Sequence, residues 1–417
     1  MPRALIVGGS VGGLFAANLL RGIGWDVAVF ERSGSDLADR GRNIGATEDL
    51  FAVMREAGPP ADASIGASWR SRICLDRNGR VVCEVPLRGL TTLWSRIYLP
   101  LKAALPSQLY HRGMRVEYVE QDASSVTAIL ADGRRETGEL LIGADGVHST
   151  VRRQFLPEIE PSYCGYVGWH VSAEGCDVPH DFRETLLDHM TFSFPDGEWL
   201  LSIPMPGRDG RTDAAGRRCQ LIWFRPADYK NILPDLFTDI FGHRHTGSIP
   251  PKLIQPRFFN ELKATARSVL PQQIAGLFER AAQPTSLHQS FELASTQIVF
   301  GRVVLLGDAA FVARRHVATG VTKAALDAKC LVDALRNSDC KIELALTLYQ
   351  RDRQQVGELL VARGRRLGGY VEAQLKIRGN GRKAMPAQWN EIIMREYGAA
   401  GIMSGDAQVP PTCSRAS

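Results

Sequence analysis

The chain has 417 residues, a formal net charge of +5, 44% hydrophobic residues and 23% charged residues. This balance is typical of a soluble globular protein and excludes the dense basic surface of a nucleic-acid-binding protein, while the lack of a long apolar run argues against a membrane partner. The eight cysteines are scattered without C-x-x-C or zinc spacing, which predicts no metal site and favours reduced thiols in the cytoplasm.

The N-terminal segment predicts a strand, a glycine-rich turn, a helix and a second strand. Residues 4–7 and 25–30 are the apolar strands, and residues 14–20 are helical. The turn reads GGSVGG. This is the dinucleotide fingerprint G-x-G-x-x-G with a serine in place of its second glycine. The fingerprint alone does not separate NAD from FAD. The nucleotide-binding candidates are Gly8, Ser10, Val11, Gly12, Gly13, the ribose-binding acid Glu31 and its neighbour Arg32.

Two later stretches repeat the pattern of a buried strand that ends in an acidic turn before a helix. Residues 140–142 precede the turn with Asp145 and Gly146, and residues 303–306 precede Gly307 and Asp308. An aspartate at such a strand end can bond a sugar hydroxyl while the amides of the next helix face a phosphate. These two turns are therefore further candidates for the nucleotide site.

Residues 161–289 contain runs of alternating apolar and polar residues, which predict a mostly antiparallel sheet. We expect this sheet to be a substrate domain inserted into a nucleotide-binding domain made of residues 1–160 and 290–340. Residues 341–400 predict a C-terminal helical region that packs on this domain or on a second subunit of a homodimer, and residues 404–417 predict a disordered tail. The predicted fold class is α/β: a Rossmann-type domain, an inserted antiparallel sheet domain and a C-terminal helical region.

Together, the three glycine-containing motifs resemble those of the single-component flavin-dependent aromatic hydroxylases. They occur in that family's order and spacing over residues 1 to about 365. The resemblance implies that the nucleotide is FAD, which NADH or NADPH would reduce, and that O2 would form a C4a-hydroperoxyflavin. The implied reaction is hydroxylation of a small, electron-rich aromatic ring, so the expected partners are this substrate and O2.

The resemblance adds cofactor-binding candidates outside the three motifs. Arg96, in SRIYLPL, matches an arginine that contacts FAD in the family, with a solvated helix residue as the alternative. Arg42 stands where the family has a basic residue near the mobile flavin, with a plain loop arginine as the alternative. Gly320 and Val321, at the start of the helix after the third motif, complete the set.

Residues 307–328 resemble the 2,6-dihydroxypyridine 3-hydroxylase type within the family, which has a histidine and a lysine at the positions of His316 and Lys323. Arg315 replaces a proline expected there, and this leaves the shape of the loop open. The resemblance implies a 2,6-dihydroxypyridine-like substrate. The alternatives are oxygenation of a larger phenolic or polyketide, and a flavin-binding NAD(P)H oxidase or binding module without oxygenation.

His316 is the candidate catalytic base, because a histidine can remove a ring hydroxyl proton near neutral pH. The alternative for His316 is a loop histidine bonded to backbone. Core packing is the alternative for each aromatic residue in the strands, because only every second residue faces the same side. Solvation is the alternative for the two arginines before His316. The residues expected to line the substrate pocket are Tyr166, Trp169, His170, Trp199, Trp223, Arg314 and Arg315.

Overall fold

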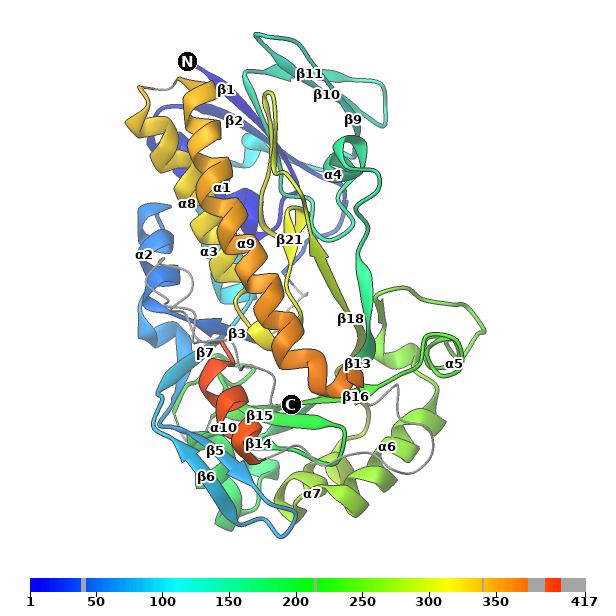
Figure 1. The fold of residues 1–417 in the computed structure, drawn as a ribbon. Coiled ribbons are helices and arrows are strands. Elements are labelled where there is room, and N and C mark those ends of the chain that lie inside the picture. The colour runs from blue at the N-terminus through cyan, green and yellow to red at the C-terminus, as the bar shows by residue number, and fades with distance from the viewer. Residues whose placement is uncertain (39–42, 214–215, 340, 374–386, 399–417) are drawn as a thin grey trace, which may run out of the picture.

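The structure is a computed structural model that describes residues 1–38, 43–213, 216–339, 341–373 and 387–398. A mostly parallel sheet lies at one end of the molecule and a large, mostly antiparallel sheet at the other, with helix α9 (Ile342–Ala373) running alongside both (Figure 1). This arrangement confirms the predicted α/β fold class. No helix in the described ranges is long and apolar enough to span a bilayer.

The mostly parallel sheet has the strand order β19-β20-β12-β1-β2-β8. Val7 of β1 pairs with Phe30 of β2 on one side and with Gly143 of β12 on the other, so the carboxyl ends of these strands meet at one edge. Ligands bind at this edge in open α/β sheets. The strands are β1 (Arg3–Val7), β2 (Asp26–Glu31), β8 (Tyr110–Arg112), β12 (Leu140–Gly143), β19 (Val299–Phe300) and β20 (Val303–Leu305).

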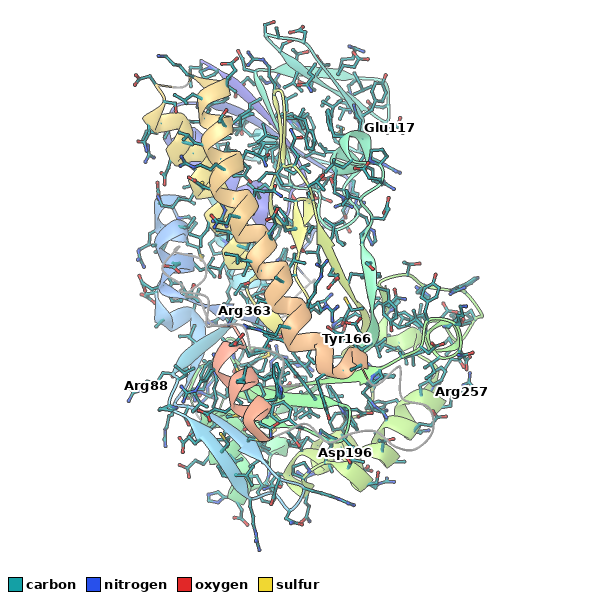
Figure 2. All side chains as sticks on the ribbon, viewed as in Figure 1. Arg88, Glu117, Tyr166, Asp196, Arg257 and Arg363 are labelled. Carbon is teal, nitrogen blue, oxygen red and sulfur yellow. The ribbon has the colours of Figure 1, made fainter. Side chains whose placement is uncertain are left out.

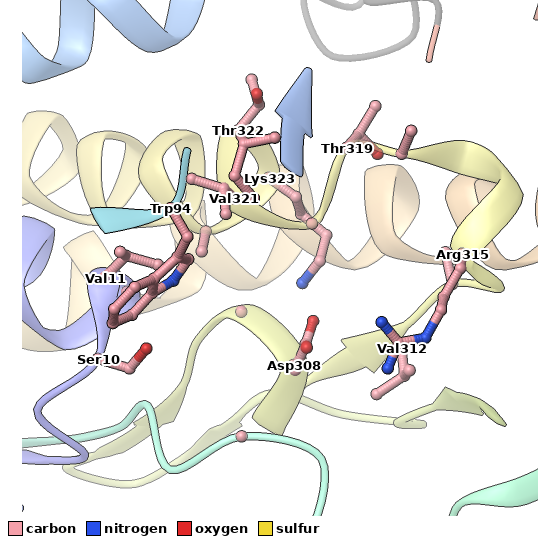
Figure 3. A pocket seen from close by; sticks show the side chains of 18 of the residues that line it. Ser10, Val11, Trp94, Asp308, Val312, Arg315, Thr319, Val321, Thr322 and Lys323 are labelled. Carbon is pink, nitrogen blue, oxygen red and sulfur yellow. The ribbon is translucent and has the colours of Figure 1, made fainter. Parts of the chain in front are cut away.

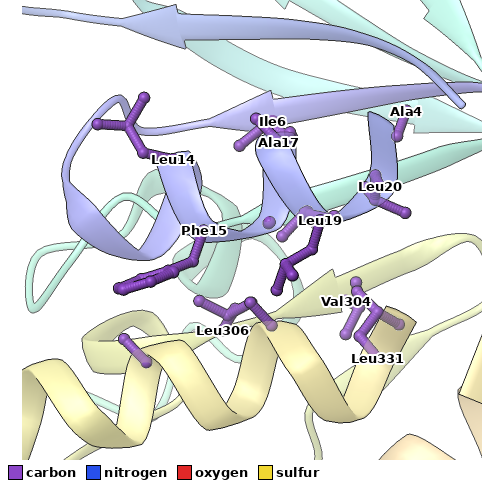
Figure 4. Packing of buried hydrophobic residues seen from close by; sticks show 14 of the residues in the cluster. Ala4, Ile6, Leu14, Phe15, Ala17, Leu19, Leu20, Val304, Leu306 and Leu331 are labelled. Carbon is purple, nitrogen blue, oxygen red and sulfur yellow. The ribbon is translucent and has the colours of Figure 1, made fainter. Parts of the chain in front are cut away.

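Helices α1 (Val11–Gly22) and α8 (Gly320–Asn337) pack against each other beside this sheet. Figure 4 shows Phe15 and Leu19 of α1 directed toward the side of α8, and both side chains are buried. Burying a side chain of this size stabilises the fold by roughly 1.5–3 kcal/mol. The packing fixes the N-termini of both helices at the carboxyl edge of the sheet.

Smaller elements surround this core. One three-stranded sheet extends from β12, and another bridges toward the large sheet. The first consists of β9 (Val116–Gln121), β10 (Val126–Leu130) and β11 (Arg135–Gly138); the second of β3 (Asn43–Ala46), β4 (Gly66–Trp69) and β7 (Gly89–Leu93). The helices here are α2 (Glu48–Glu56), α3 (Ser95–Ala104) and α4 (Thr150–Phe155).

The large sheet has the strand order β17-β18-β13-β16-β15-β14-β5-β6, and β21 pairs with β18. Strands β5 and β6 come from residues 72–85, so the sheet also recruits a hairpin from outside residues 161–289. Its strands are β5 (Arg72–Leu75), β6 (Val81–Val85), β13 (Ser162–Glu174), β14 (Met190–Ser193), β15 (Trp199–Met205), β16 (Arg218–Pro226), β17 (Ser248–Ile249), β18 (Ser286–Ala294) and β21 (Phe311–Val312). The helices beside it are α5 (Leu233–Leu236), α6 (Pro256–Val269) and α7 (Gln272–Arg280).

Alternation along β13 divides its side chains between the two faces of the large sheet. Val167, Trp169 and Val171 belong to the core shared with α6 and α7. Tyr166 and His170 therefore face the opposite side, toward the Rossmann-type domain. This face, and not the one covered by α6 and α7, is the side of the large sheet that can contribute to a site between the two sheets.

The C-terminal helices connect the two ends of the molecule. Helix α9 contacts α8 at one end and β13, β16 and β18 at the other. Helix α10 (Ala387–Glu396) packs on β5 and β6. The predicted tail at residues 404–417 lies outside the described residues.

Candidate active site

A cavity of about 910 Å³ joins the carboxyl edge of the mostly parallel sheet to the face of the large sheet that lies opposite α6 and α7. Its lining includes the β1–α1 turn, the end of β2, the β12–α4 turn and the segment from Gly307 to Ala324. Further lining residues come from β13, β14, β15 and β16. Segments far apart in the sequence thus form one site with a polar end and a more apolar end.

The β1–α1 turn has the close backbone approaches that its glycines predict. Gly8 has a φ of +110°, and a Cβ there would lie 2.4 Å from the carbonyl oxygen of Ala144. A Cβ on Gly13 would lie 1.9 Å from the carbonyl oxygen of Gly8, so Gly13 shapes the turn without lining the cavity. Ser10 is the N-cap of α1, makes no capping hydrogen bond, and points toward the cavity (Figure 3). The N-terminus of α1 is therefore open to an anion.

Glu31 lines the cavity beside this turn, as the ribose-binding prediction requires. Its side chain is 6% exposed, and its carboxylate accepts hydrogen bonds from the backbone N–H of Gly9 at 2.9 Å and of Ser33 at 2.8 Å. Arg32 also lines the cavity. The carboxylate thus has a fixed orientation and retains lone pairs for a further donor.

Asp145 and Gly146 line the cavity at the start of α4. The Asp145 carboxylate accepts hydrogen bonds from Ser149 Oγ at 2.5 Å and from the backbone N–H of Thr150 at 2.6 Å. Burial nevertheless raises the pKa of Asp145 above its ordinary value. The carboxyl group therefore anchors the turn. Because its pKa is raised, it is protonated more readily than an exposed aspartate, and the protonated form can donate a hydrogen bond to a neighbouring acceptor.

Arg152 connects the two acidic turns, a link that the sequence alone does not reveal. Its wholly buried guanidinium donates to the carbonyl oxygens of Ala309 at 3.1 Å and Val147 at 2.8 Å. Because both acceptors lie next to candidate cofactor residues, the arginine holds the β12–α4 turn and the GDAA turn in a fixed relation.

The GDAA turn presents Asp308 to the cavity, where its side chain is exposed. The backbone N–H of Gly307 donates to Asp327 Oδ2 at 3.0 Å, and Arg353 binds the other oxygen of the same carboxylate at 2.6 Å. Gly320 and Val321, in the first turn of α8, also line the cavity. Asp327 and Arg353 are supporting residues that the motif analysis did not identify.

The structure places Arg314 in a buried charge network and not on the surface. Its side chain is 5% exposed, and its guanidinium pairs with Glu292 and Glu372, each at 2.7 Å. It still lines the cavity. Arg315 is exposed and lines the cavity too, and Figure 3 shows its side chain on the Val312 side of the site. Two carboxylates hold Arg314, and Arg315 is the more exposed of the two at the cavity.

His316 does not have the surroundings of the predicted catalytic base. It is wholly buried, is absent from the described lining of the cavity, and its Nε2 lies 2.6 Å from the Tyr166 hydroxyl. Its ring packs on Trp199, with a centroid separation of 4.3 Å. Burial, with a smaller effect of the nearby Arg314 charge, lowers the pKa of His316 to about 3. A neutral, enclosed imidazole with this pKa cannot take a proton from a ligand in the cavity near neutral pH.

The aromatic residues proposed for the pocket also lie elsewhere. Trp169 and Trp223 belong to the core on the helix-covered face, and Tyr166 and Trp199 lie behind the cavity wall, around His316. None of the four is in the described lining. The register of the strands decided these orientations, and the run of strand residues alone could not specify it.

Two arginines predicted from the resemblance are not brought to the cavity. Arg96 donates to the carbonyl oxygen of Gly210 at 2.6 Å and is absent from the lining that the structure describes, whereas its neighbour Trp94 is present. Arg42 lies outside the described residues. In this structure it is Trp94, two residues before Arg96, that lines the cavity.

The more apolar end of the cavity is built mainly by the large sheet. Met190, Ile203, Ile222 and Phe224 line it, together with His170. Arg72 and Tyr397 contribute from the side of α10. Of these, His170 is the side chain that was named as a pocket candidate from sequence and is found there; Arg72 and Tyr397 were missed because their contacts depend on how α10 docks.

The cavity fits an extended, anionic cofactor. The N-termini of α1 and α8 both face it, and neither Ser10 nor Thr319 makes a side-chain capping bond within the described residues. The ammonium of Lys323 lies at the same cavity, buried and without a hydrogen-bond partner in the described part of the chain. Unsatisfied helix amides and a buried cation are donors that a negatively charged dinucleotide would satisfy.

Comparison with known proteins identifies this cofactor class. Residues 163–287 match a family described as FAD binding domain-like. The chain is 31% identical to 2,6-dihydroxypyridine 3-monooxygenase of Paenarthrobacter nicotinovorans over 341 residues, which cover 81% of this chain and 84% of the relative. It is 27% identical to aurachin C monooxygenase/isomerase of Stigmatella aurantiaca, covering 87% and 88% of the two chains.

Solved structures give the same result. The structure of 2,6-dihydroxypyridine-3-hydroxylase from Arthrobacter nicotinovorans superposes with a TM-score of 0.82 and 28% identity, covering 92% of this chain and 96% of that one. A salicylate hydroxylase shares the fold, with a TM-score of 0.71 at 16% identity. The chain therefore belongs to the FAD-dependent aromatic hydroxylases and is a flavoprotein monooxygenase.

Proposed function

We propose that this protein hydroxylates a small, hydroxylated N-heteroaromatic ring of the 2,6-dihydroxypyridine type, using NADH or NADPH and O2. The observation that carries the proposal is the two-ended cavity, in which a cofactor-binding edge opens onto the compact, largely apolar face of the large sheet. When bound, FAD supplies the redox chemistry, since it accepts hydride from the nicotinamide and activates O2. The relatives named above support the substrate class.

The residues that would hold FAD are those of the cavity's polar end. The open N-terminus of α1, with Ser10, would receive the pyrophosphate, and Glu31 the adenosine ribose. Asp308 would bond the ribityl hydroxyls from the GDAA turn. The remaining candidates of the lining are Gly8, Val11, Gly12, Arg32, Asp145, Gly146, Gly307, Gly320 and Val321.

His170 is the residue that we propose to accept the proton of a substrate hydroxyl. It lies on the cavity face of β13, is 7% exposed, and its ring centroid is 4.6 Å from that of His288. Its neighbours along the cavity wall, such as Ile222, are apolar. A base at this place in the wall would both orient a hydroxypyridine and make its ring electron-rich by deprotonation.

The direct test is a substrate panel. Purified FAD-loaded protein would be given NADH or NADPH with hydroxypyridines, hydroxybenzoates or larger phenolics and polyketides, and the products identified by mass spectrometry. We expect a dihydroxypyridine to accelerate NAD(P)H oxidation and to gain one oxygen atom. Turnover of a large ring system alone would favour the second candidate, a natural-product oxygenase, to which the similarity to the aurachin C enzyme points. NAD(P)H oxidation that no aromatic compound stimulates would contradict both.

We also propose a homodimer as the assembly and the cytoplasm as the location. The proposed domains are residues 1–160 with 290–340, residues 161–289 and residues 341–400, with the hairpin of β5 and β6 added to the second of these. The support for the location is the spacing of the eight cysteines, which contains no C-x-x-C pair, since scattered, reduced thiols are typical of the cytoplasm.

A further inference from the structure

Lys323 of α8 is a buried cation that no structural role accounts for. Its side chain is 3% exposed, it lines the cavity, and its ammonium makes no hydrogen bond within the described residues. The nearest ion-pair partner is Asp327, one turn later, with Nζ 3.6 Å from Oδ2. Figure 3 shows the ammonium directed away from the axis of α8, toward the turn with Asp308.

The charges around Lys323 do not cancel. Arg353 binds Asp327 Oδ1 through both Nε and Nη2 at 2.6 Å, and the backbone N–H of Gly307 takes Oδ2 at 3.0 Å. Asp327 is therefore already satisfied, and this cluster contains two cations for one carboxylate. Asp308 faces the same space in Figure 3, yet no ion pair joins it to Lys323 in the described structure. The Lys323 ammonium is thus left beside the cavity without a hydrogen-bonded carboxylate in the described structure.

The N-terminus of α8 adds to this positive potential. Gly320, Val321 and Thr322, its first residues, line the cavity, and the side chain of Thr319 does not cap them. Their amides and the helix dipole favour negative charge at the same place as the ammonium. Because the α1 turn and Glu31 account for the adenosine half of FAD, the isoalloxazine ring is the part left for this end, next to the large sheet.

We propose that Lys323 is the cation that stabilises the reduced flavin ring as an anion, an inference that rests on FAD binding in the cavity. Hydride transfer from NAD(P)H delivers two electrons and one proton to the neutral ring, and NAD(P)⁺ leaves. The reduced ring thus carries one negative charge unless it takes up a second proton. A fixed cation in a site of low dielectric stabilises that charge and has little effect on the neutral oxidised ring. Lys323 therefore acts on the cofactor's redox equilibrium.

The test is the two-electron midpoint potential of bound FAD, measured by spectroelectrochemistry. In Lys323→Met we expect the potential to fall, because the reduced form alone loses its counter-ion; a tenfold loss in the preference for reduced over oxidised FAD corresponds to about 30 mV. Lys323→Arg, which keeps the charge, should stay near the wild-type value. The matched control is Lys329→Met on the same helix, whose ammonium pairs with Glu56 and Asp333 away from the cavity.

An unchanged potential in Lys323→Met, within the range of the Lys329→Met control, would overturn the inference. Folding should survive, since Arg353 still pairs with Asp327 after the change. If Lys323→Met does not retain FAD, Lys323→Gln and Lys323→Arg decide, and equal potentials for these two would again contradict the proposal. Failure of the wild-type protein to bind FAD would instead refute the function on which the inference rests.

Discussion

The buried contact between His316 and Tyr166 is stable because neither ring carries a charge. The Tyr166 hydroxyl and His316 Nε2 lie 2.6 Å apart in a site closed to water, with Trp199 and Phe224 packed on the imidazole. Burial raises the pKa of Tyr166 and lowers that of His316 to about 3. Both shifts favour the neutral pair, so this histidine contributes to folding and not to proton transfer.

The first prediction concerns the acid stability that follows from His316. In the folded protein His316 stays neutral down to about pH 3, whereas in the unfolded chain it binds a proton near the ordinary value of 6.5. Between these values the unfolded state binds more protons, so the free energy of unfolding falls as the pH falls. From about pH 7.5 to about pH 5.5, the wild type should lose about 1.4 kcal/mol more than His316→Gln.

Urea unfolding of both FAD-loaded proteins at the two pH values measures this difference. Parallel pH dependences in the wild type and the variant would show that His316 becomes protonated inside the folded protein, against this account.

The second prediction concerns His170. Replacing it with glutamine removes the proposed base from the cavity wall, so kcat/KM for a hydroxypyridine should fall by roughly 100-fold or more. The acid limb of the pH profile of kcat/KM should disappear, while the affinity for FAD stays unchanged. Stopped-flow and steady-state kinetics across pH are the measurements. A variant that keeps the wild-type pH profile would remove His170 from the mechanism, whatever its rate.

In helix α1 and the turn before it, steric contacts restrict some positions of the fingerprint more than others. A Cβ on Gly13 would lie 1.9 Å from a backbone carbonyl oxygen, whereas Ser10 already has a Cβ and points toward the cavity. The third prediction is therefore that Gly13→Ala lowers FAD affinity at least tenfold, or abolishes it, and that Ser10→Gly changes it by less than about threefold. Fluorescence titration of the apoproteins with FAD measures both; equal affinities would contradict the steric argument.

Two buried cations bind helix α10: Arg72 of β5 holds it on the large sheet, and Arg363 of α9 binds Glu396 at its C-terminal end (Figure 2). Nη1 of Arg72 donates to the carbonyl oxygens of Met394 and Tyr397, and Arg72 is 5% exposed. Burial lowers its pKa to about 10, so the side chain stays charged near neutral pH. Hydrogen bonds to a charged group contribute about 1.5–3 kcal/mol each. The docking of α10, and with it Tyr397 at the cavity, therefore depends strongly on Arg72.

The fourth prediction follows from this contact. Arg72→Met should loosen α10, raise the KM for the aromatic substrate several-fold and speed proteolysis near the helix, while FAD affinity is retained. The matched control is Arg70→Met, whose guanidinium is two-thirds exposed and pairs with Glu184 and Asp188 at the surface. Identical KM values and digestion patterns for the two variants would show that Arg72 does not hold the helix.

The sequence predicted the features that depend on local chemistry and could not predict those that depend on register. Short apolar strands ending in glycine or aspartate specify the cofactor edge, because that pattern is needed wherever a backbone approaches a phosphate. Whether Trp169 or His170 faces the cavity depends on the pairing of β13 with β16, which places His170 opposite Ile222. The ion pairs of Arg314 likewise form with residues on distant elements.

At the scale of the whole molecule, one cavity couples two sheets through the segment between β20 and α8. That segment presents Asp308 and the first turn of α8 to the cofactor end, and it buries Arg314 and His316 against the large sheet. Helix α9 packs on both domains, and its Arg353 binds Asp327 of α8, the carboxylate that also accepts the backbone N–H of Gly307 in the GDAA turn. The cofactor end and the substrate end are thus held in one rigid relation, as transfer of an oxygen atom between two bound molecules requires.

The most direct test of the account is the fate of isotope-labelled O2 during turnover with a dihydroxypyridine and NAD(P)H. The account predicts that one labelled oxygen atom enters the aromatic product for each molecule of product formed, because the FAD-bound protein is a monooxygenase. Label recovered only in hydrogen peroxide or water, with the aromatic compound unchanged across the whole panel, would identify an oxidase and contradict the central claim.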